Sequence, residues 1–72
     1  MNTNDKWLAD QALEILGNKD KGTIDYLKSI AKKSDSIHKV EKFLHDFDVP
    51  TENNPRNQHF ASDLWTKFGS RT

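Results

Sequence analysis

The chain has 72 residues and no cysteine, and its 11 basic residues balance 11 acidic ones, so the formal charge is zero. This length suits one small domain, which neither a disulfide nor a thiolate metal site can stabilise. The balanced charge argues against a dedicated nucleic-acid-binding module, and no apolar run is long enough to cross a membrane. We therefore expect a single domain over residues 1–72, with an ordered core at about 5–68 and a net stability of about 5 kcal/mol.

The first predicted helix begins after Thr3 or Asn4, either of which can cap it, and ends at Gly17. Its apolar residues recur at helical spacing, which predicts one buried face. Trp7 lies about 80–100° off this face, at the edge of the core. The predicted face consists of Leu8, Ala12, Ile15 and Leu16, widened by Ala9 and Leu13.

The second predicted helix covers about residues 20–33, and Asn18 or Asp20 can cap it. Gly22 weakens its first turn, and Tyr26 lies beside the apolar stripe. The inward-facing residues are predicted to be Thr23, Ile24, Leu27, Ile30 and Ala31.

The third predicted helix follows a short polar linker in which Ser36 can act as the cap. Apolar residues at positions 37, 40, 43, 44 and 47 form one stripe, and polar residues fill the positions between them. Because the linker is so short, the second and third helices should lie close together.

A polar loop over residues 48–55 carries both prolines, and Asn54 followed by Pro55 is typical of a capped helix start. The fourth helix then ends at Gly69. Its buried face is predicted to consist of Phe60, Ala61, Leu64, Trp65 and Phe68. Together the four segments predict an all-α, compact bundle of four main helices.

Catalytic and metal sites are not expected. The histidines His38, His45 and His59 are predicted to be solvated on helix surfaces. No nucleophile is paired with a base, and no glycine-rich phosphate loop is present. We therefore expect no enzymatic activity, no cofactor and no small-molecule substrate, and we expect a monomer.

Two groups of residues are candidates for contacts with a partner. A basic stretch around the junction of the second and third helices could contact RNA phosphates. The simpler interpretation is solvation, with the two lysines at the end of the second helix complementing its dipole. Trp7 and Tyr26, at the edges of apolar stripes, are the candidates for protein contact. The basic stretch consists of Lys28, Lys32, Lys33, Lys39 and Lys42.

Several segments resemble one known family when they are taken in order. The similarity covers about residues 5–68 and consists mainly of apolar positions and helix ends. It includes Trp7-Leu8-Ala9-Asp10-Gln11, Ile15-Leu16-Gly17, Tyr26-Leu27, residues 31–36, Val40-Glu41-Lys42-Phe43-Leu44 and Phe60-Ala61-Ser62-Asp63-Leu64-Trp65. In this order they resemble the PWI-like N-terminal domain of spliceosomal DEAH-box pre-mRNA splicing RNA helicases.

The resemblance implies a PWI-like bundle placed ahead of a helicase core in a nuclear protein. Such domains serve protein or RNA contacts, so we expect a non-catalytic domain that docks onto a spliceosomal protein. The chain lacks a Pro-Trp-Ile tripeptide and a basic flank, which favours protein over RNA. Two alternatives remain: a weak RNA-binding module that uses the lysines, and a free-standing helical adaptor of ubiquitin-associated or death-domain type.

Overall fold

The computed structural model describes residues 3–69, and within this range the protein consists of four α-helices without any strand. The helices are α1 (Thr3–Leu16), α2 (Lys21–Lys33), α3 (Ile37–Asp46) and α4 (Pro55–Phe68). Each lies within a few residues of the segment predicted for it. The prediction of an all-α bundle of four main helices is confirmed.

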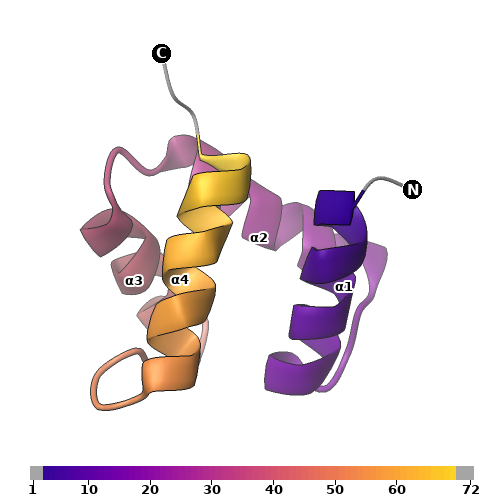
Figure 1. Cartoon of the computed structure of the whole chain (residues 1–72), viewed down its shortest axis with the longest axis horizontal. Helices are drawn as coiled ribbons and strands as arrows, with labels where there is room; N and C mark the ends of the chain where they lie inside the picture. Colours follow the sequence, from indigo (N-terminus) through magenta and orange to yellow (C-terminus); the bar gives the residue numbers. More distant parts are fainter. Residues whose placement is uncertain (1–2, 70–72) are drawn as a thin grey trace.

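α2 and α4 form the centre of the bundle, and α1 and α3 lie on opposite sides of them (Figure 1). α1 contacts α2 and α4, and α3 contacts the same two helices. α1 and α4 run in opposite directions in this view. Because α1 and α3 do not contact each other, each outer helix depends on the central pair for its apolar neighbours.

The core is apolar and draws on all four helices and on the loop before α4. Every fully buried leucine in such a core contributes about 1.5–3 kcal/mol relative to an exposed one. Its buried members are Leu8 and Ala12 of α1, Leu27, Ile30 and Ala31 of α2, Val40 and Leu44 of α3, Val49 of the loop, and Phe60, Ala61 and Leu64 of α4.

Local signals set most of the helix ends as predicted, but α1 already begins at Thr3, so neither Thr3 nor Asn4 precedes it as a cap. Ser36 Oγ accepts a hydrogen bond from the Lys39 backbone N–H at 3.3 Å, and Asn54 Oδ1 accepts one from the Asn57 N–H at 3.1 Å. Gly17 ends α1 with φ of +79°, a conformation that costs glycine little. Asp20 occupies the cap position of α2, but its side chain makes no capping hydrogen bond.

Two residues predicted to be buried are exposed. Leu13 is 49% exposed and Ile37 is 38% exposed. Leu13 follows the buried Ala12 and is therefore turned about 100° away from it, and α1 has no third helix to cover that side. Ile37 is the first residue of α3, where no preceding turn of helix shields it.

The loop before α4 is held more firmly than its polar sequence indicates. Val49 is 1% exposed and Thr51 is 7% exposed. The Asn57 side-chain amide donates to the Pro50 carbonyl at 2.7 Å, and Gln58 Nε2 donates to the Thr51 carbonyl at 2.8 Å. The first turn of α4 therefore fixes the loop that leads into it.

None of the four helices has the length and apolar character that crossing a membrane requires, as far as residues 3–69 are concerned.

Candidate docking face

Three aromatic side chains meet where α2 packs against the end of α3. Phe43 lies in α3 and Phe47 directly follows its last residue. Because the Phe47 N–H still donates to the Phe43 carbonyl at 3.1 Å, the two side chains lie on one side of this last turn. The ring of Tyr26, from the middle of α2, packs against Phe47 with centroids 4.7 Å apart and a tilt of 53°. Tyr26 is 36% exposed, and the two phenylalanines are partly buried. We call these three residues the aromatic cluster.

Lys33 lies over this cluster. Its ammonium nitrogen is 4.5 Å from the centroid of Phe43 and 5.5 Å from that of Tyr26. A cation over aromatic rings at an exposed site is stabilised by about 0.5–1 kcal/mol. The rings therefore favour one position for a lysine that would otherwise sample many rotamers.

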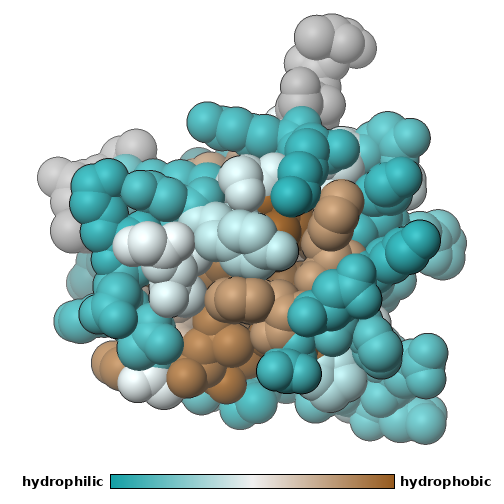
Figure 2. All heavy atoms as spheres, turned by 180° about the vertical axis from the view of Figure 1, so that it is seen from behind, coloured by the Kyte–Doolittle hydropathy of each residue, from teal (hydrophilic) through white to brown (hydrophobic). Residues whose placement is uncertain are grey.

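Figure 2 shows the side of the molecule that lies behind in Figure 1, where α2 is nearest to the viewer. Apolar side chains gather at the centre of this side, and hydrophilic side chains surround them. An apolar area with a polar rim is typical of surfaces that bind another macromolecule.

Trp7 lies elsewhere, between α1 and α4. Its indole stacks on Phe60 with centroids 5.7 Å apart and planes 23° apart, and the Lys67 ammonium lies 5.3 Å from its ring. Phe60 itself is only 2% exposed, so this stack joins α1 to the core. Trp7 and Tyr26 are thus not brought together, and Trp7 has less free ring surface to offer a partner.

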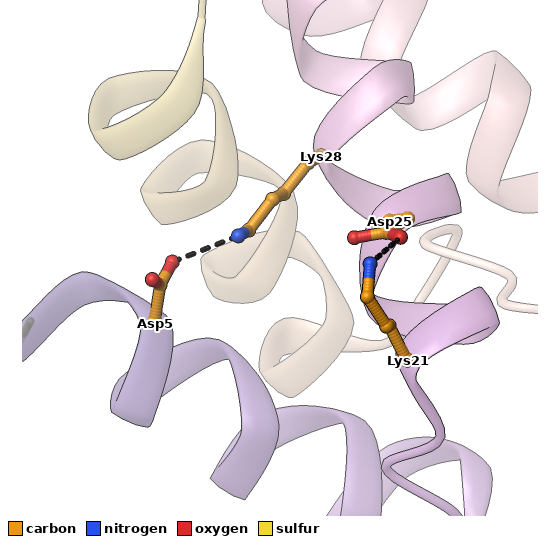
Figure 3. A network of polar contacts seen from close by, with 4 residues as sticks. All are labelled: Asp5, Lys21, Asp25 and Lys28. Carbon is orange, nitrogen blue, oxygen red and sulfur yellow. Dashed lines mark hydrogen bonds and ion pairs between the residues drawn. The ribbon is translucent and has the colours of Figure 1, made fainter. Parts of the chain in front are cut away.

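Lys28, the first of the five candidate RNA-contacting lysines, connects helices. Figure 3 shows it reaching from α2 to Asp5 on α1, and the Nζ–Oδ1 distance is 2.9 Å. The same ammonium lies 5.8 Å from the ring centroid of Phe68 at the end of α4. With these neighbours, Lys28 ties three helices together.

The other candidate lysines occupy different surroundings. Lys33 belongs to the aromatic cluster described above, whereas Lys32 and Lys39 are exposed. Lys42 lines an open hollow of about 400 Å³ that also contains the carboxylates Glu41, Asp46 and Glu52. The five lysines therefore do not form one uniformly cationic surface.

A second open hollow, of about 540 Å³, lies between α1 and α2, and its lining includes the apolar residues Ala9 and Ile24. Lys21 on its rim forms a 2.8 Å ion pair with Asp25 (Figure 3). The hydrogen bond between them raises the pKa of Lys21 and lowers the pKa of Asp25. Since Lys28 on the same rim pairs with Asp5, most of the cationic groups here already have a carboxylate partner.

The three histidines are exposed on the helix surfaces. His38 Nδ1 lies 3.7 Å from Glu41 Oε1, and the His38 side chain is 97% exposed. Among the residues from 3 to 69, no group of three or more histidine and carboxylate side chains is arranged to hold a metal ion.

Sequence reasoning missed Phe43 and Phe47 as contact residues, because it assigned them to the buried stripe of the third helix. α3 is only 10 residues long, and Phe47 lies just beyond its last residue. The sequence carries no signal for their partial exposure, because apolar residues at this spacing form an ordinary core-facing stripe.

Comparisons with protein-family models, with curated proteins and with solved structures gave no match.

Proposed function

We propose that this domain is a non-catalytic docking module that binds a protein through the aromatic cluster. One observation carries the proposal: Tyr26, Phe43 and Phe47 remain partly exposed as a contiguous group, beneath a lysine that the rings themselves hold. Aromatic anchors dominate the binding energy of protein interfaces. The small size and the single compact core also suit a binding module better than an enzyme.

The class of partner comes from the sequence resemblance alone. Segments throughout the chain resemble the PWI-like domain of spliceosomal DEAH-box RNA helicases, so we propose a spliceosomal protein in the nucleus as the partner. In that setting the domain recruits or positions a helicase and takes no part in its ATPase chemistry.

RNA binding is the second candidate, and the exposure of Lys32, Lys39 and Lys42 favours it. Lysine contacts to phosphate would make binding fall steeply as salt is raised. Two observations weigh against it: Lys28 is paired with Asp5, and carboxylates surround Lys42.

Site-specific photocrosslinking tests the proposal. Benzoylphenylalanine replaces Tyr26 in the full chain, which is added to a splicing-competent nuclear extract and irradiated. Crosslinked proteins are identified by mass spectrometry, and radiolabelled RNA is followed in parallel. The matched control carries the same group in place of Leu13, an apolar residue that is also exposed but lies on α1.

We expect a spliceosomal protein to crosslink from position 26 and not from position 13. Crosslinks from position 26 to RNA alone would replace the proposal with the RNA-binding module. Crosslinks to a protein unrelated to splicing would favour the free-standing adaptor. Equal crosslinking from both positions would show that the aromatic cluster is not a docking site.

A further inference from the structure

We infer that the occupant of the aromatic cluster is an acidic peptide segment, with an apolar side chain on the rings and a carboxylate at Lys33. This inference rests on the proposed docking function and specifies its partner chemistry. It follows from the charges around the cluster, the position of Lys33 and the arrangement of the rings.

The end of the cluster nearest the α2–α3 linker carries excess positive charge. Lys32 and Lys33 close α2, and Lys39 lies four residues before Phe43, on the same side of α3. Asp35 in the linker is the acidic residue among them. Lys33 lies on the same side of α2 as Tyr26, whereas Lys32 is turned about 120° from Tyr26. On the side of the cluster, Lys33 and Lys39 against one aspartate leave a basic flank, to which an acidic segment is complementary.

The opposite end of the cluster is acidic. Asp46 and Asp48 flank Phe47 in the sequence, and both are exposed. The face is therefore polarised from the linker towards the end of α3. A bound segment with its carboxylates at the linker end avoids repulsion from Asp46 and Asp48, so the charges select one orientation as well as one sign.

Lys33 is the residue best placed to receive a carboxylate. Its ammonium group carries three donors, and its contacts in the structure are with the rings of Phe43 and Tyr26. A carboxylate that approaches from solvent gains a charge-assisted hydrogen bond. Because the rings already favour this lysine position, binding loses less side-chain entropy than it would with a freely rotating lysine.

The arrangement of the rings favours a peptide over RNA. Sequence-tolerant RNA binding uses aromatic faces on which bases stack. Here Tyr26 and Phe47 are tilted by 53° against each other, and Lys33 lies over Tyr26 and Phe43. Partly buried, tilted rings offer edges and a shallow apolar surface, which suit a branched or aromatic side chain better than a planar base.

The test uses three fluorescent probes and the full chain. One peptide has a Leu-Phe-Leu centre with glutamates on one flank, a second has lysines in place of those glutamates, and the third probe is oligouridine RNA. Binding is followed by fluorescence anisotropy, and amide shifts in NMR spectra locate the contact. The variants are Lys33→Glu and Lys33→Met, with Lys6→Glu as the matched charge reversal on α1.

We expect the glutamate peptide to bind most tightly and to shift amides around Tyr26 and Phe47. Lys33→Glu should weaken its binding by about tenfold or more and should favour the lysine peptide instead. Lys33→Met should have a smaller effect, because its unbranched chain still covers the rings. Lys6→Glu should change the affinity by less than about twofold, as expected for a distant exposed charge.

Several results would overturn the inference. Equal binding of the two peptides, or tighter binding of the lysine peptide, would remove the acidic specificity. If position 26 still crosslinks to a protein in the nuclear extract, such a result overturns the acidic specificity but leaves the proposed docking function standing. If neither peptide binds while position 26 still crosslinks to a protein, the acidic peptide is likewise excluded as the occupant and the docking function stands. Tighter binding of oligouridine, weakened by Lys33→Glu, would assign the face to RNA. Circular dichroism melting of each variant separates a loss of binding from a loss of folding. Because Lys33 is exposed, we expect the melting temperature of its variants to change little.

Discussion

The two outer helices, α1 and α3, contact the same central pair but are held in different ways. α3 begins with the Ser36 cap and buries Val40 and Leu44. The loop that follows it is held by hydrogen bonds from Asn57 and Gln58, and we call it the clamped loop. α1 buries Leu8 and Ala12, and long side chains at its edges link it to the bundle.

The two helices differ in the contacts that break when each one detaches from the bundle. Detachment of α3 breaks its apolar contacts with α2 and α4 and pulls on the following loop, which Asn57 and Gln58 hold to α4. Detachment of α1 breaks fewer contacts with α2 and α4, together with the Trp7–Phe60 stack and an ion pair that is partly exposed to water. Local opening in small domains begins where fewest buried contacts must break, so α1 should open before α3.

The largest expected effect comes from a cavity at either outer helix. Leu44→Ala and Leu8→Ala each remove a fully buried side chain and should cost about 2–5 kcal/mol. We expect Leu44→Ala to lower amide protection in all four helices. Leu8→Ala should release α1 first and leave protection in α2, α3 and α4. Native-state hydrogen exchange distinguishes the two, and the same loss pattern in both variants would refute the comparison.

Loss of a hydrogen bond that holds the clamped loop should have a smaller effect on stability. Asn57→Ala removes the hydrogen bond to the Pro50 carbonyl and should lower the free energy of unfolding by about 1–2 kcal/mol. Asn57 is 3% exposed and its Oδ1 accepts no hydrogen bond, so the removal of that unpaired atom offsets part of the loss. Urea denaturation measures the change. Gln58→Ala, at an exposed position, should cost less, and a larger cost there would contradict the assignment of Asn57 as the main clamp.

The ion pair between Asp5 of α1 and Lys28 of α2 should contribute less to the free energy of unfolding, and its contribution should depend on salt. Lys28→Met removes the ion pair with Asp5 but keeps an apolar chain near Phe68. We expect a loss of about 0.5–1 kcal/mol at low salt that disappears near 1 M salt. Lys21→Met is the control, because its pair with Asp25 is far more exposed. Equal losses in the two variants would show that the Asp5 pair has no special role in holding α1.

The smallest effect is the pH response of the Lys21–Asp25 pair within α2. The hydrogen bond from Lys21 lowers the pKa of Asp25 below its ordinary value of 3.8. The small stabilisation from this pair is therefore present above that value and is lost as the pH falls through the folded-state pKa. NMR titration of the Asp25 carboxyl should show the lowered pKa. In Lys21→Gln the pKa should return towards 3.8, and an unchanged pKa would exclude the pair as the cause.

Much of the fold could be predicted because its signals are local. Ser36 and Asn54 accept the capping hydrogen bonds that their positions suggest, and Gly17 ends α1 with a positive φ. Helical periodicity also placed most of the buried residues. These features depend on neighbours within four residues along the chain, and the sequence displays those directly.

The remaining features depend on neighbours that are distant in the sequence. Leu13 is exposed because α1 contacts only two helices, which its own periodicity does not reveal. Val49 is buried because α4 clamps the loop around it.

The candidate site shows the same limit. Tyr26 could be singled out from its place beside a stripe, but its partner Phe47 could not. The candidate lysines lie close together in the sequence. The packing of α1 on α2 pairs Lys28 with Asp5, and the packing of α3 on α2 places Lys33 over two aromatic rings.

The clamped loop also determines where the chain can be engineered. Residues 48–54 look like an ordinary polar connection, but an inserted tag there would break the hydrogen bonds to Asn57 and Gln58 and displace Val49. The segment from Gly17 to Asp20 is exposed along its whole length and buries no side chain. A fluorescent reporter or an affinity epitope therefore belongs in that segment, where it leaves both the core and the aromatic cluster undisturbed.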